Sequence, residues 1–62
     1  MDSVEKTDAK RIYDDARYAI DYLTAIVKEC ESSYVSRRYL MEKIRGAFNC
    51  VSFIKETLVE EK

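Results

Sequence analysis

Small and apolar residues recur along this chain at alternating spacings of three and four, in two separate runs. That spacing places them on one face of an α-helix and forms a heptad seam that packs against other helices. The first seam consists of Ala9, Ile12, Ala16, Ala19, Leu23, Ile26 and Cys30. The second consists of Leu40, Ile44, Ala47, Val51, Ile54 and Leu58. Because the chain has no proline and only one glycine, we expect an all-α protein with two long helices.

The stretch between the seams, residues 31–36, contains three serines. Serine hydroxyls compete for backbone hydrogen bonds and lower helix propensity. We therefore expect a turn at about residues 31–35, with Ser36 as the N-cap of the second helix. One continuous helix in a coiled coil is the alternative, since neither proline nor glycine occurs in this stretch.

These signals predict a single helical-hairpin domain over residues 1–62. Its first helix is expected at about residues 3–30 and its second at about residues 36–60. Asp2 and Glu5 have the spacing of a capping box at the start of the first helix.

Folding back at about residue 33 brings the two seams together in an antiparallel hairpin. The facing pairs are then Ile12–Ile54, Ala16–Val51, Ala19–Ala47, Leu23–Ile44 and Ile26–Leu40. In this register Cys30 and Cys50 lie roughly 20 Å apart along the helix axis, which is too far for a disulfide. We expect both to be buried free thiols.

The apolar stripes are wider than one hairpin can bury. Five large side chains lie beside the seams, namely Tyr13, Ile20, Val27, Met41 and Phe48. A domain of this size also buries only about 60% of the surface that its unfolded chain exposes. We therefore expect two copies to associate as a homodimeric four-helix bundle.

Further aromatic residues lie off the seams, on the other flank of each helix. They are Tyr18, Tyr22, Tyr39 and Phe53. Aromatic side chains dominate the energetics of protein interfaces, so this stripe is a candidate binding patch for a second protein. The alternative is that the stripe closes the homodimer.

Basic residues gather at the start of the second helix, at Arg37, Arg38, Lys43 and Arg45. With Tyr39 among them, they are candidate contacts for RNA or DNA phosphates. Glu42 interrupts the series. Salt bridges or simple solvation of these charges are the alternative interpretation.

The composition excludes most enzyme chemistry. The chain has no histidine, so it has no Ser-His or Cys-His relay and no imidazole metal site, and its one glycine cannot build a phosphate-binding loop. The clustered carboxylates Asp14, Asp15 and Asp21 are interpreted as surface charges. We expect no catalytic residues, no cofactor, no metal and no small-molecule substrate.

The overall charge is nearly balanced, at 11 basic and 12 acidic residues. No apolar run is long enough to cross a membrane, and no signal-peptide pattern is present at the start of the sequence. We expect a cytoplasmic protein that does not bind membranes.

The sequence therefore favours a small non-enzymatic protein-interaction module, acting as a regulator, inhibitor, chaperone or adaptor. It would act as a helical dimer that presents its aromatic stripe to a partner protein. A nucleic-acid-binding dimer that uses the basic start of the second helix is the alternative.

Overall fold

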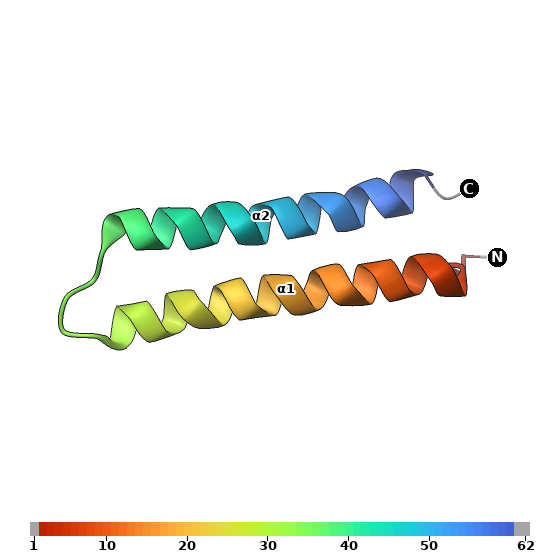
Figure 1. Cartoon of the computed structure of the whole chain (residues 1–62). Coiled ribbons are helices and arrows are strands. Elements are labelled where there is room, and N and C mark those ends of the chain that lie inside the picture. Colours follow the sequence, from red (N-terminus) through yellow and green to blue (C-terminus); the bar gives the residue numbers. More distant parts are fainter. Residues whose placement is uncertain (1, 61–62) are drawn as a thin grey trace.

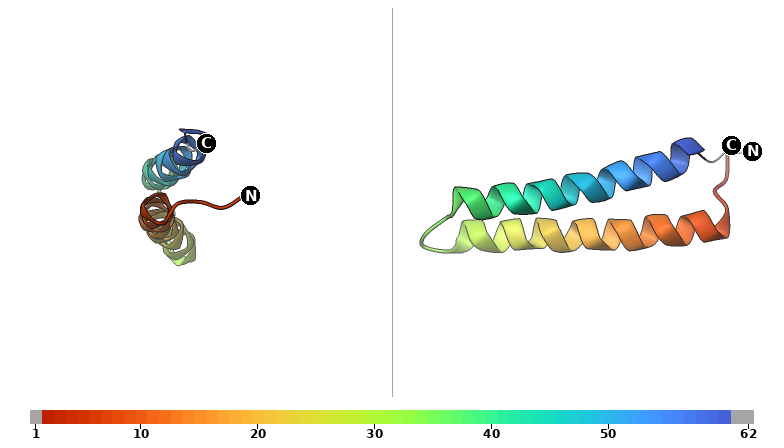
Figure 2. Two further views of the ribbon diagram at one scale, coloured as in Figure 1. Left: turned by 90° about the vertical axis from the view of Figure 1, so that its right-hand side faces the viewer. Right: turned by 45° about the horizontal axis from the view of Figure 1, so that its top comes forward.

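The computed structural model describes residues 2–60, which form an antiparallel hairpin of two helices (Figure 1). Helix α1 spans Lys6–Glu31 and helix α2 spans Arg37–Glu60. They lie side by side along their length in Figure 1 and in the right-hand view of Figure 2, joined by residues 32–36 at one end. The molecule is a rod of 49 × 15 × 14 Å. The all-α hairpin is confirmed, and the continuous helix is wrong.

Hydrogen bonds from the end of α1 and from the start of α2 hold the loop between the helices. The backbone N–H of Tyr39 donates to Ser36 Oγ at 3.2 Å, as expected of an N-cap serine. The N–H of Ser36 donates to a carboxylate oxygen of Glu29 at 2.8 Å. Ser32 Oγ lies 2.8 Å from the Glu29 carbonyl oxygen and 2.7 Å from that of Tyr34. These bonds tie the end of α1 to the start of α2.

The start of α1 differs from the expectation. The helix begins at Lys6, with Glu5 in the N-cap position in an extended conformation. Asp2 therefore lies outside the helix, and the capping box predicted from Asp2 and Glu5 is wrong.

The contact between the two helices uses one strip of residues on each. On α1 the strip, which we call the contact strip, is Asp8, Ile12, Asp15, Ala19, Tyr22, Ile26 and Glu29. On α2 it is Leu40, Lys43, Ala47, Cys50, Ile54 and Thr57. All of these are buried or half-buried, and Ala19, Ala47 and Cys50 are the buried residues within the part of the chain described. The expected facing pair Ala19–Ala47 thus lies at the centre of the contact.

The contact strips coincide with only half of the predicted seams. Every second seam residue is absent from them: Leu23, Ile44, Val51 and Leu58 are 50, 53, 55 and 46% exposed. Residues one position earlier in the sequence lie in the contact instead. Relative to the predicted register, each helix is therefore rotated about its own axis by about half of the roughly 100° step between successive residues. The prediction that both seams lie wholly between the helices is therefore wrong.

The cysteines are unpaired, but they are not equally buried. Cys50 belongs to the contact strip and is buried, whereas Cys30 is exposed. The expectation of a buried free thiol is correct for Cys50. It is wrong for Cys30, because the rotation of α1 brings Glu29 into the contact in its place.

Gly46 on α2 lies against the ring of Tyr22 on α1. A Cβ atom at this position would lie 2.5 Å from ring atoms of Tyr22, well inside van der Waals contact. The same ring lies 5.8 Å from Lys43 Nζ, which is 5.0 Å from the ring of Tyr39. The absence of a side chain at Gly46 therefore leaves the space that the Tyr22 ring occupies against α2.

We expect the effect of Gly46→Ala on stability to depend on Tyr22. In a Tyr22→Ala background the methyl group meets open space, so the higher helix propensity of alanine should add about 1 kcal/mol to the free energy of unfolding. With Tyr22 present, the ring must move away and most of that gain should be lost. Urea denaturation followed by circular dichroism, at one chain concentration, measures both values.

The matched control is Asn49→Ala, at an exposed position of the same helix. Its effect should be equal in the two backgrounds. Equal effects of Gly46→Ala in both backgrounds would show that the ring and the glycine are not coupled.

Candidate protein-interaction surface

The principal surface feature is a set of large apolar side chains that the hairpin leaves in solvent. We call this set the apolar face. From α1 it includes Tyr13, Ile20, Leu23 and Val27, and from α2 Met41, Ile44, Phe48, Val51 and Leu58. Each of them is between 46 and 68% exposed. A row of this kind along a small domain is typical of an interaction surface.

The members of the apolar face lie on one side of the hairpin. Each directly follows a residue of the contact strip, as Ile20 follows Ala19 and Phe48 follows Ala47. One residue is a turn of about 100° around a helix. Because α1 and α2 run in opposite directions, this step turns both rows toward the same side. The apolar face is therefore continuous across the two helices.

The predicted interface residues are divided between this face and other parts of the surface. Five of them belong to the apolar face, namely Tyr13, Ile20, Val27, Met41 and Phe48. The apolar face also contains four residues that the seam pattern predicts between the helices, namely Leu23, Ile44, Val51 and Leu58. The sequence signal for this difference is Gly46. It leaves room for the Tyr22 ring between the helices, and Leu23, the next residue of α1, then lies outside the contact.

The remaining predicted aromatic residues lie on the opposite side, which we call the outer side. Tyr18 and Phe53 directly precede contact-strip residues, so they are turned away from the apolar face, and they are 62 and 55% exposed. Tyr22 is half-buried against Gly46. Tyr39 is 37% exposed and lies beside Lys43. Of the four, Tyr18 and Phe53 are thus the most accessible to a partner.

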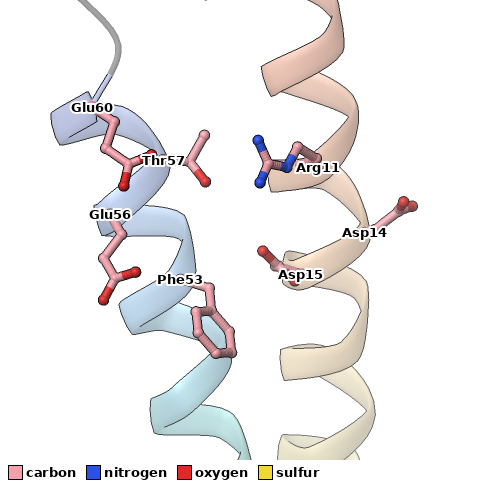
Figure 3. Close-up of a pocket in the computed structure, with 7 residues that line it drawn as sticks. All are labelled: Arg11, Asp14, Asp15, Phe53, Glu56, Thr57 and Glu60. Carbon is pink, nitrogen blue, oxygen red and sulfur yellow. The ribbon is translucent and has the colours of Figure 1, made fainter.

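A hollow of about 360 Å³ opens on the outer side near the end of the hairpin away from the loop (Figure 3). Its lining residues are Arg11, Asp14, Asp15, Phe53, Glu56, Thr57 and Glu60. The side chains of Arg11, Asp15 and Phe53 extend into the space between the helices, whereas Asp14 points away (Figure 3). Residues 2–60 contain no cluster of three carboxylates or thiols arranged to hold a metal ion. The hollow offers charges and one aromatic ring.

The basic residues of α2 do not form one strip. Arg37, Arg38 and Arg45 line a second hollow of about 480 Å³ together with Met41 and Glu42. Lys43 is turned away from them, beside Tyr22 and Tyr39.

No salt bridge neutralises these arginines within the described residues. The ion pairs there join Lys10 to Asp14 at 3.6 Å and Arg11 to Asp8 at 3.7 Å, both within α1. The described residues contain no ion pair between Arg38 or Arg45 and Glu42 or an acid of α1, so of the alternative to nucleic-acid binding the simple solvation of these charges remains. These side chains remain available to an anionic ligand.

Comparison with known protein families, curated proteins and solved structures finds no match to this chain. Neither α1 nor α2, the helices of residues 2–60, has an apolar stretch long enough to cross a lipid bilayer. The interpretation of function therefore depends on the surface geometry described above.

Proposed function

We propose that this protein is a non-enzymatic protein-interaction module that acts as a homodimer. Two hairpins pack apolar face against apolar face and form a four-helix bundle. The outer side, with Tyr18 and Phe53, then remains free to bind a second protein, in the manner of a regulator, inhibitor, chaperone or adaptor. The two unpaired thiols fit a reducing compartment such as the cytoplasm.

The direction of the heptad seams carries this proposal. In a four-helix bundle each helix has two neighbouring helices, which lie in directions about a right angle apart when viewed along the bundle axis. Its core seam points between these two directions, toward the bundle axis. Here the contact strip and the apolar face are separated by about 100° on each helix. Each predicted seam draws on both sets, since Ile12 belongs to the contact strip and Leu23 to the apolar face, so the average direction of the seam lies between them. This direction of the seams supports a four-helix bundle over an isolated hairpin.

The apolar area is large enough to support association. Nine side chains per copy are about half exposed, and covering the exposed half of each contributes about 1 kcal/mol. Two copies would gain on the order of 18 kcal/mol in total, whereas association costs roughly 4–15 kcal/mol. A second copy thus supplies the burial that the hairpin lacks.

A second candidate function is nucleic-acid binding. The observation that favours it is the group Arg37, Arg38 and Arg45, which lies at one hollow and has no carboxylate partner within the described residues. In a dimer this group would occur twice.

We expect the chain to have twice its 7.3 kDa mass in solution. Phe48→Glu should give the monomer mass and a loss of helical signal, because a charge replaces the most exposed side chain of the apolar face. Light scattering coupled to size exclusion measures the mass. The control is Phe53→Glu, on the outer side, which should remain dimeric. A wild-type monomer of full helicity would contradict the dimer, and dissociation by Phe53→Glu alone would assign the interface to the outer side.

We expect Tyr18→Ala combined with Phe53→Ser to remove the partner protein from pull-downs, since these rings offer most of the exposed aromatic area on the outer side. Mass spectrometry of co-purified proteins measures the loss. Tyr34→Ala is the control, because Tyr34 is 79% exposed but lies in the loop. Unchanged recovery of every partner by the double variant would rule out this patch.

For the second candidate, the expected result is RNA or DNA retardation that weakens steeply as salt increases. Replacing Arg37, Arg38 and Arg45 by serine should abolish it. Lys43→Ser, the matched control, should retain it because Lys43 is turned away from the arginines. Absence of retardation at low salt would exclude this function.

A further inference from the structure

We propose that the hollow on the outer side receives an arginine side chain from a basic segment of the partner protein. This inference rests on the proposed binding of a second protein to the outer side, and it assigns the chemistry of that partner. The hollow has a volume of about 360 Å³ and lies on the side of the hairpin opposite the apolar face. It therefore stays open to a partner in the proposed dimer.

The charges around this hollow are mostly negative. Four acidic side chains and one basic side chain line it, namely Asp14, Asp15, Glu56 and Glu60 against Arg11. The guanidinium of Arg11 is paired with Asp8 at 3.7 Å, and Asp14 is paired with Lys10 at 3.6 Å. Asp15, Glu56 and Glu60 form no ion pair within residues 2–60. These three carboxylates favour a cationic group from a partner.

Asp15 differs from the other two because it lies on the contact strip, where α1 packs on α2. It is half-buried, and its side chain extends into the space between the helices (Figure 3). Within residues 2–60 it has neither a hydrogen bond nor an ion pair. A carboxylate that loses water without gaining a partner destabilises the folded chain. A cation in the hollow would offset that loss.

The ring of Phe53 decides which cation fits best. It is 55% exposed and extends into the same space as Asp15 (Figure 3). A guanidinium group is planar, so it can stack on an aromatic ring and also form paired hydrogen bonds with a carboxylate. The compact ammonium of lysine has no such flat face. The combination of ring and carboxylates therefore favours arginine.

The hollow on α2 near the loop disfavours the same partner. Three arginines and a single carboxylate, that of Glu42, line it. A basic segment is therefore attracted to one end of the rod and repelled from the other. Complementary charges of this kind fix the position of a partner on a surface.

Nuclear magnetic resonance titration of the isotope-labelled full chain tests the proposal. The probe is a short amidated peptide that alternates arginine with leucine, and its counterparts carry lysine or glutamate in place of arginine. We expect the arginine peptide to bind most tightly and to shift the amide signals of Asp15, Phe53 and Thr57. Equal binding of the lysine peptide would overturn the assignment to arginine. Tightest binding of the glutamate peptide, or shifts centred on Ile20 and Phe48 of the apolar face, would overturn the proposal as a whole.

Variants then test the named carboxylates. Glu56→Gln combined with Glu60→Gln should weaken binding of the arginine peptide roughly tenfold, and the nearly isosteric Asp15→Asn should weaken it as well. The matched control is Glu31→Gln combined with Glu42→Gln, which removes the same charge from exposed positions toward the loop end. It should retain the wild-type affinity. Equal losses in the two double variants would overturn the proposal, because the peptide would then respond to overall charge alone. Circular dichroism first establishes that each variant is as helical as the wild type.

The pull-down with Tyr18→Ala and Phe53→Ser separates failure of this inference from failure of the proposed function. If the arginine peptide does not bind, and that double variant still loses a partner protein, the outer side binds a protein of different chemistry and only this inference is wrong. If the peptide does not bind and the double variant retains every partner, the proposed binding of a second protein to the outer side fails as well.

Discussion

The approach of Tyr22 to Gly46 is the interaction on which the arrangement of the molecule depends. Because position 46 lacks a Cβ atom, the ring lies directly against α2. Small residues at the centre of the contact, Ala19 and Ala47, allow the same closeness. With Tyr22 in the contact, Leu23 is turned outward, and so is Cys30, seven positions after it. The contact between Tyr22 and Gly46 thus accompanies a rotation that leaves Leu23 and Ile44 in solvent.

This arrangement gives the hairpin two sides of different character. On one side the apolar face runs along both helices. On the other side Phe53, Arg11 and Asp15 border a hollow (Figure 3). A partner for the first side must be apolar and long, as another helical pair is. A partner for the second side would need charged groups complementary to Arg11 and Asp15 and an apolar surface for the Phe53 ring. Mixed surfaces of this kind are typical of transient complexes.

The fold could be predicted from the sequence because its determinants are local. Heptad spacing, the serine-rich stretch and the N-cap Ser36 each act over a few residues, and the turn lies where they place it. The rotation of the helices could not be predicted in this way. A heptad seam points toward the average position of all neighbouring helices, and the pattern does not say how many there are. Hence the pattern predicts Leu23 and Ile44 in the hairpin contact, where they do not lie, whereas it predicts Tyr13 and Phe48 outside that contact, as observed.

The thin contact between α1 and α2 also has a consequence for the abundance of the protein. Two alanines and one cysteine are buried in the described hairpin, so in the proposed bundle most of the folding free energy comes from association. The folded fraction of such a protein rises with its own concentration. Chains present at low concentration would unfold and be degraded. At concentrations above the dissociation constant of the dimer, the chains would be dimeric and folded. The cellular level of this protein would then act as a threshold for its activity.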